Sequence, residues 1–129
     1  MARKYTCVSL FSGAMGLDLG LEQTGRFRLL TSVEKEPAFC ETVRGNQRRG
    51  KLPRALRVVE ADVAAVEPVG LLRSAGVAAG ELDVLVGGPP CQAFSVFGKR
   101  RGLDDARGRL IFEFVRFVAA TRPKAFLLE

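Results

Sequence analysis

The residues best suited to covalent chemistry lie in the segment Gly87–Ser95 (GGPPCQAFS), directly after the apolar run Val84–Val86. Two consecutive prolines cannot continue a strand ladder, and each fixes φ near about −65°. We therefore expect the thiol of Cys91 to be held on a stiff turn at the end of a strand. A lone cysteine usually serves as a small apolar side chain, but glycine and proline contribute shape rather than packing. This context favours a nucleophile.

The sequence limits the partners of such a nucleophile. It contains no histidine, which excludes His-dependent triads and the histidine-based metalloprotease sites. Any acid or base must then be a carboxylate, a thiol, an amine or water. The three cysteines lack C-x-x-C spacing, which argues against a disulfide framework and a structural zinc site. We expect no metal, and a reducing compartment.

Composition and charge indicate one globular domain with a polyanionic partner. The 129 residues are 47% apolar, and 20 Lys and Arg against 14 Asp and Glu give a net charge of +6. An excess of basic residues favours nucleic acid as the partner. No apolar run reaches the roughly 18 residues that a membrane span needs, and no secretory signal is recognisable. We expect a cytoplasmic protein.

Short apolar runs alternate with helical patterns, which predicts an α/β fold with a mostly parallel sheet and flanking helices. The predicted strands are Thr6–Phe11, Leu29–Val33, Arg57–Ala61, Val84–Val86 and Ala125–Leu128. The predicted helices are Met15–Thr24, Pro37–Arg48, Val69–Ala75 and Gly108–Thr121.

The spacing of apolar residues predicts which helix faces are buried. In the helix over 37–48 the predicted buried face is Phe39, Cys40 and Val43. In the helix over 108–121 it is Leu110, Phe114, Phe117 and Val118, widened by Ile111 and Val115. The basic, glycine-containing segment Gly45–Arg54 is predicted to be a solvated loop.

Every unusual polar or glycine motif follows a predicted strand. These motifs are the loop 11–16 (FSGAMG), Glu34, Asp62, the Pro-Pro-Cys turn and Glu129. Singly, a strand-terminal carboxylate is more often a helix cap or a solvated residue. Because ligands of parallel sheets bind at the carboxyl ends of the strands, the joint placement predicts a single crevice.

Gly13 and Gly16 admit two interpretations. They make the tight turn that any strand-to-helix connection needs, or they let the backbone approach a nucleotide-like ligand at the helix start. The loop matches neither the G-x-G-x-x-G dinucleotide pattern nor the G-x-x-x-x-G-K-[ST] phosphate loop. Glu34, near the end of the second strand, is placed to accept hydrogen bonds from ribose hydroxyls. An adenosine-containing cofactor is expected.

Taken together, these motifs resemble the N-terminal half of a DNA cytosine-5 methyltransferase. The resemblance extends from Tyr5 to Glu129, and its most specific parts are the block Gly88–Ser95 and the stretch 98–110. It implies a truncated Rossmann-like fold of the S-adenosylmethionine-dependent methyltransferases. Residues 1–129 would be the N-terminal part of the cofactor-binding and catalytic domain, without a target-recognition domain.

The resemblance implies S-adenosyl-L-methionine as the cofactor and assigns a role to each residue of its pocket. Phe11 would stack near the adenine, Glu34 would bind the ribose, and Lys35 would flank the adenine. The methionine part would be held by the loop of Ser12, Gly13, Ala14, Met15 and Gly16. The remaining implied contacts are Asp62 and Val63 at the adenine amino edge, and Pro90 and Leu110.

The resemblance also implies the chemistry. Cys91 would add to carbon 6 of a flipped cytosine, which turns carbon 5 into a nucleophile for the methyl group. Glu129 would hydrogen-bond and protonate ring nitrogen 3 as negative charge builds in the ring. The implied DNA contacts are Gln92, Ser95, Lys99, Arg100, Arg101, Arg107 and Arg109, although a solvated charge run is the simpler interpretation of each arginine.

The sequence departs from the family pattern at two points. The family commonly has a second glycine where Met15 stands, so we expect a slightly displaced loop. The later motifs and the recognition region are missing after Glu129, so we expect negligible methylation by this chain alone. The implied partners are DNA and a second polypeptide or C-terminal region, in a prokaryotic, nucleoid-associated setting.

Three alternatives remain at this level. A tRNA cytosine-5 methyltransferase would share the Pro-Pro-Cys architecture and engage RNA instead. A non-catalytic cofactor-fold module would keep the sheet without the reaction, although Cys91 and Glu129 are both present. A generic α/β fold that binds another nucleotide is the third.

Overall fold

The structure is a computed structural model that describes residues 2–90 and 108–129. Its strands are β1 (Tyr5–Leu10), β2 (Phe27–Glu34), β3 (Arg57–Glu60), β4 (Val84–Gly87) and β5 (Ala125–Leu128). Its helices are α1 (Gly16–Gln23), α2 (Pro37–Arg48), α3 (Pro68–Ser74) and α4 (Leu110–Thr121), with a short 3-10 turn, η1, at Val63–Ala65. Within these residues no helix is long and apolar enough to cross a membrane.

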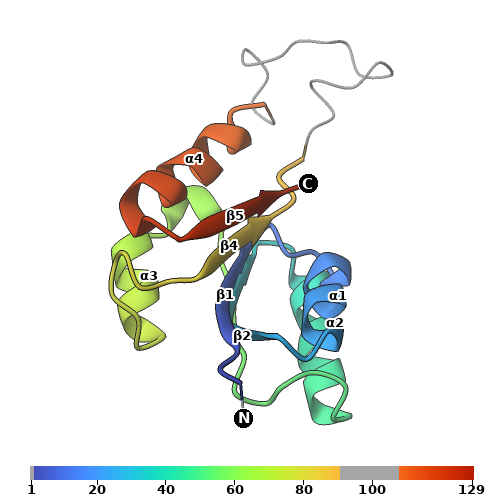
Figure 1. The fold of residues 1–129 in the computed structure, drawn as a ribbon. Coiled ribbons are helices and arrows are strands. Elements are labelled where there is room, and N and C mark those ends of the chain that lie inside the picture. The colour runs from blue at the N-terminus through green and yellow to red at the C-terminus, as the bar shows by residue number, and fades with distance from the viewer. Residues whose placement is uncertain (1, 91–107) are drawn as a thin grey trace.

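The strands form one parallel sheet in the order β3-β2-β1-β4-β5. Helices α1 and α2 cover one face, and α3 and α4 cover the other (Figure 1). The order reverses between β1 and β4, because the chain leaves β1 toward β2 and later returns to the other side of β1. Such a reversal opens a crevice at the carboxyl ends of the two strands, since their connections leave in opposite directions.

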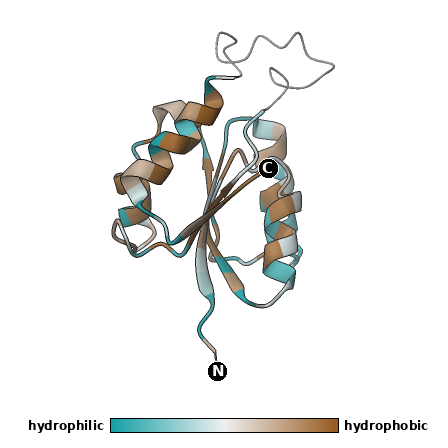
Figure 2. Ribbon diagram, turned by 45° about the horizontal axis from the view of Figure 1, so that its top comes forward, coloured by the Kyte–Doolittle hydropathy of each residue, from teal (hydrophilic) through white to brown (hydrophobic). Residues whose placement is uncertain are grey.

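A buried apolar cluster lies on each face of the sheet, and Figure 2 shows apolar strands between the two helix layers. Successive residues of β1 contribute to opposite clusters, because side chains alternate across a strand. Val8 packs with Phe114 and Phe117 of α4, while Cys7 packs with Leu29 and Val43. Burial on both faces explains the apolar run of the central strand β4, whose residues Leu85, Val86 and Gly87 are buried.

The structure confirms every predicted strand and α-helix, with ends that differ by at most two residues. Three expectations about burial were wrong. Phe39 is 44% exposed and Val115 is 52% exposed, so the apolar faces of α2 and α4 are narrower than predicted. The segment Gly45–Arg54 is not a loop throughout, because α2 continues to Arg48 and Leu52 is buried in the core.

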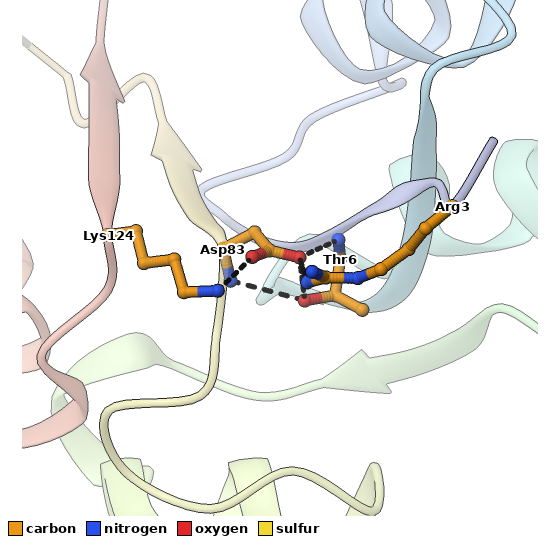
Figure 3. A network of polar contacts seen from close by, with 4 residues as sticks. All are labelled: Arg3, Thr6, Asp83 and Lys124. Carbon is orange, nitrogen blue, oxygen red and sulfur yellow. Dashed lines mark hydrogen bonds and ion pairs between the residues drawn. The ribbon is translucent and has the colours of Figure 1, made fainter.

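At the amino end of the sheet, Asp83 joins three strands of the fold (Figure 3). Its carboxylate accepts hydrogen bonds from the backbone N–H of Thr6 at 2.8 Å and from Lys124 Nζ at 2.9 Å. Arg3 pairs with the same group, and the hydroxyl of Thr6 also donates to it. Burial opposes ionisation of Asp83, but these donors together hold its pKa well below the usual range.

Candidate active site

Two neighbouring clefts lie at the carboxyl ends of the strands. The first cleft has a volume of about 360 Å³ and is lined by Phe11, Gly13, Val33, Glu34, Lys35, Glu36, Phe39, Ala61, Asp62, Val63, Gly88, Pro90 and Leu110. The second cleft has a volume of about 520 Å³ and is lined by Ser9, Leu10, Phe11, Ser12, Gly16, Leu17, Asp18, Gly87, Gly88 and Glu129. Both volumes fall in the range of roughly 300–1,000 Å³ that small-molecule sites occupy. Phe11 and Gly88 border both clefts.

Backbone hydrogen bonds extend the ladder past the strand ends and fix the residues that follow. The N–H of Ser12 donates to Val33 O at 3.3 Å, and the N–H of Ala61 donates to Glu34 O at 3.0 Å. On the far side, the N–H of Glu129 donates to Gly87 O at 3.0 Å. Residues at all five strand ends line one or the other of the two clefts, whereas the sequence predicts a single crevice.

The loop between β1 and α1 is conformationally strained. Phe11, Gly13 and Met15 have φ values of 53°, 54° and 71°, in the left-handed region that side chains disfavour. This conformation explains why glycine suits the position of Met15. Met15 is tolerated there because its side chain is only 1% exposed and packs in the cluster with Cys7 and Leu29. Strain of this kind is concentrated at functional sites.

Glu34 ties the loop after β1 to the loop after β2. Its Oε1 accepts from the N–H of Gly13 at 3.0 Å, and its Oε2 accepts from the N–H of Glu36 at 2.8 Å. Each carboxylate oxygen can accept two hydrogen bonds. One acceptor position on each oxygen is therefore open to a ligand in the first cleft, while the other holds the cleft wall.

Asp62 has the capping role that a strand-terminal carboxylate commonly has. Its Oδ1 accepts from the N–H of Ala64 at 3.0 Å, which starts the turn η1. Arg116 of α4 holds the same turn from behind, because its guanidinium donates to Val63 O at 3.0 Å and to Val66 O at 3.1 Å. Capping uses one oxygen of Asp62, and the residue still lines the first cleft.

The second cleft contains buried polar atoms without partners. Ser12 Oγ and Asp18 Oδ1 have no hydrogen-bond partner within the described part of the chain. Burial raises the pKa of Asp18, and hydrogen bonding by Ser9 and by its own backbone amide offsets this only in part. Glu129 directly follows β5, and its Oε2 lies 3.8 Å from the position that a Cβ on Gly88 would take. Buried unpaired polar atoms in a cleft point to a bound ligand.

The structure brings most of the predicted cofactor residues together. Those in the first cleft are Phe11, Gly13, Glu34, Lys35, Asp62, Val63, Pro90 and Leu110. Ser12, Gly16 and the predicted catalytic Glu129 line the second cleft. Ala14 and Met15 line neither cleft, and Arg109 is an exposed residue at the start of α4. The predicted residues Cys91, Gln92, Ser95, Lys99, Arg100, Arg101 and Arg107 lie outside the described residues.

Sequence reasoning missed several residues of these clefts, among them Phe39, Glu36 and Asp18. Phe39 was assigned to the core by its helical spacing, yet it forms a wall of the first cleft. Glu36 gave no signal beyond its position before Pro37. Asp18 carried no distinctive signal, because a carboxylate in the first turn of a helix commonly serves only to stabilise the helix dipole. Among the residues the structure describes, no group of three or more His, Cys, Asp or Glu is placed to hold a metal ion.

Comparisons with solved structures show the fold. A DNMT2 variant from Spodoptera frugiperda matches 89% of the chain with a TM-score of 0.60 at 16% identity, and the match covers 31% of that protein. A protein from Methanococcus maripaludis, described as a putative S-adenosyl-L-methionine-dependent methyltransferase, matches 90% of the chain with a TM-score of 0.55 at 16% identity, and covers 44% of that protein. The chain thus shares the Rossmann-like α/β fold of these two proteins.

Comparisons of sequence are more specific. Type II methyltransferase M.AquIA from Picosynechococcus sp. is 43% identical over 95% of this chain, which corresponds to 46% of that relative. DNA (cytosine-5-)-methyltransferase M.ApeKI from Aeropyrum pernix is 42% identical over 98% of the chain and 28% of its own length. The chain spans less than half the length of these curated relatives. A profile of the C-5 cytosine-specific DNA methylases matches residues 5–129, and the chain belongs to this family.

Proposed function

We propose that this chain carries the cofactor site and the catalytic residues of an enzyme that methylates carbon 5 of cytosine in DNA. The observation that carries the proposal is the position of Gly88, which borders both clefts and lies just before Pro90 and Cys91 in the sequence. The first cleft has the chemistry of an adenosine site, and the second contains Glu129. A base in the second cleft would thus lie beside the methyl donor.

The residues of the first cleft fit the adenosine part of S-adenosyl-L-methionine. Its walls include the apolar side chains of Phe11, Phe39 and Leu110, which suit a purine ring. The open acceptor positions of Glu34 suit the two ribose hydroxyls, and the uncapped oxygen of Asp62 suits the adenine amino group. The unpartnered Ser12 Oγ and Asp18 Oδ1 give polar partners for the rest of the molecule in the second cleft.

The reaction follows from the residue types. The thiolate of Cys91 forms a bond to carbon 6 of cytosine, and the electron pair displaced toward carbon 5 makes that atom nucleophilic. The cofactor, when bound, would supply an electrophilic methyl group to carbon 5 and be left as S-adenosylhomocysteine. Glu129 holds a proton at ring nitrogen 3 and limits the negative charge there. Loss of the carbon 5 proton to a base then expels Cys91 and restores the ring.

Additional polypeptide is expected to complete the protein. In the described part of the sheet β5 is one of the two edge strands, and its residues Phe126, Leu127 and Leu128 are 56%, 42% and 43% exposed. An exposed apolar edge strand favours pairing with another segment. Because the curated relatives are more than twice as long, we propose that further sequence packs here and supplies the target-recognition domain. Residues 1–129 are then the N-terminal part of the catalytic domain, and the proposed setting is the cytoplasm of a prokaryotic cell.

The test is transfer of a labelled methyl group from S-adenosylmethionine to duplex DNA by the intact protein that contains this chain. Cys91→Ser should lower the rate by at least about 1,000-fold, since a hydroxyl is a far weaker nucleophile than a thiolate. Binding of S-adenosylhomocysteine, measured by calorimetry, should remain. Glu34→Ala should instead weaken that binding.

Cys40→Ser is the matched control, because its thiol is buried in α2 and donates to Glu34 O, a contact that a hydroxyl reproduces. It should leave methyl transfer largely intact. Full activity of Cys91→Ser would exclude the covalent step. Methyl transfer to tRNA and none to duplex DNA would show that the substrate is RNA. Methyl transfer to neither would favour a non-catalytic cofactor-fold module.

A further inference from the structure

Asp18 is a buried carboxylate that the fold leaves without a full set of partners. The residue is 1% exposed and lines the second cleft, and its Oδ1 is buried with no hydrogen-bond donor among the described residues. A buried carboxylate oxygen without a donor costs stability, so native structures pair nearly all such atoms. The contrast with Asp83, whose two oxygens both accept hydrogen bonds, shows that this sheet can satisfy a buried aspartate where no ligand is needed.

The charges around the second cleft indicate what its ligand must carry. Asp18 and Glu129 both line the cleft, and no lysine or arginine of the described chain does. Helix α1 starts in the same wall, with Gly16 and Leu17 lining the cleft. The free N–H groups of a helix start favour an anion, whereas an unpaired carboxylate favours a cation. Together they suit a group with both charges on one carbon, which is an amino acid.

We propose that Asp18 binds the α-ammonium group of the methionine part of S-adenosylmethionine, with Oδ1 accepting one of its N–H bonds. The inference rests on the proposed function, because it assumes that the adenosine part occupies the first cleft. A ligand that continues past Phe11 and Gly88 enters the second cleft beside Asp18. The α-carboxylate of the ligand then lies at the start of α1. Asp18 is a cofactor-binding residue in this arrangement, distinct from the Ser12–Gly16 loop.

The test compares two ligands that differ in the amino-acid part. Calorimetric titration of the intact protein uses S-adenosylhomocysteine, which has the α-ammonium group, and 5′-methylthioadenosine, which lacks the whole amino-acid portion. Asp18→Asn removes the charge and keeps the shape. We expect Asp18→Asn to weaken the binding of S-adenosylhomocysteine by about 10- to 100-fold, which corresponds to the loss of a charge-assisted hydrogen bond. Affinity for 5′-methylthioadenosine should stay within about twofold, as for independent sites.

Glu34→Ala is the matched control, since Glu34 faces the ribose that both ligands share, and it should weaken both ligands alike. A second measurement needs no variant. The analogue of S-adenosylhomocysteine that lacks only the α-amino group should bind the unaltered protein about 10- to 100-fold more weakly than S-adenosylhomocysteine does. Asp18→Asn should then weaken that analogue no further.

Two outcomes would overturn the proposal. An equal loss for both ligands would show that Asp18 acts through the fold of the cleft. Unchanged affinity for S-adenosylhomocysteine would show that Asp18 pairs with another part of the intact protein. If the unaltered protein binds 5′-methylthioadenosine but Asp18→Asn has no selective effect, only this inference fails. If it binds neither ligand, the proposed function fails and the inference fails with it.

Discussion

The two ends of the sheet treat a buried aspartate in opposite ways. At the amino end, Asp83 accepts hydrogen bonds from Arg3, Thr6 and Lys124, and its pKa is held well below the usual range. At the carboxyl end, burial raises the pKa of Asp18, and Oδ1 has no partner among the described residues. Polar contacts stabilise the amino end of the sheet. The carboxyl end has polar groups without hydrogen-bond partners and a strained backbone. The hydrogen-bond partners of a buried carboxylate therefore distinguish one that stabilises the fold from one that is available to a ligand.

A large effect on stability is expected at the amino end of the sheet. Asp83→Ala should destabilise the chain by about 3 kcal/mol, because it leaves the Thr6 N–H unpaired and removes charge-assisted hydrogen bonds. This loss of stability is smaller than the largest values for breaking a buried ion pair, because the side chains of Arg3 and Lys124 are 64% and 58% exposed. Urea denaturation measures it. Glu60→Ala, in a half-exposed pair with Arg44, is the control and should change stability by less than about 0.5 kcal/mol.

The strained loop predicts an unusual order of two substitutions at Met15. Both Met15→Ala and Met15→Gly empty a buried site and should cost stability, with a loss of about 2–4 kcal/mol for alanine. Glycine should lose about 1 kcal/mol less than alanine, because it adopts φ of 71° without steric conflict. Thermal or urea unfolding of the two variants measures which one is more stable. A glycine variant less stable than the alanine variant would show that the left-handed conformation is not costly here.

The smallest effect is the pH dependence of the two aspartates, and its sign is opposite at the two ends. The lowered pKa of Asp83 contributes stability that is present above its unfolded value of about 3.9 and is lost as pH falls toward the folded value. The raised pKa of Asp18 contributes stability that is present below about pH 3.9 and is lost as pH rises through the folded value.

Asp18→Asn should therefore stabilise the chain by up to about 1 kcal/mol at pH 7 and have no effect near pH 3. Urea denaturation across this range provides the measurement. Asp83→Asn should have the reverse profile, with its largest cost at neutral pH. A loss of stability on Asp18→Asn at pH 7 would mean that the carboxylate is already paired in the folded chain.

The sequence predicted the elements well because their signals are local. The short apolar strands, the proline at the start of α2 and the apolar spacing of α4 each act over a few residues, so their ends were off by two residues at most. The placement of Glu34, Asp62 and Glu129 at strand ends also needed only the order of elements. Burial of individual side chains was less predictable, since Phe39 follows the helical spacing of a core residue and instead faces a ligand cleft.

By itself, the sequence determined the parallel α/β fold, its membership of the C-5 cytosine-specific DNA methylases and the residues that end each strand, because these depend on periodicity and on contiguous motifs. Only the tertiary structure decided how the polar groups are paired. It joined Asp83 to Arg3 and Lys124 across three strands, made Glu34 a clamp between two loops, and left Asp18 facing a cleft. Hydrogen-bond donors that are distant in sequence reach a carboxylate only when the sheet has formed. No local sequence pattern therefore distinguishes a carboxylate that is hydrogen-bonded within the fold from one that is not.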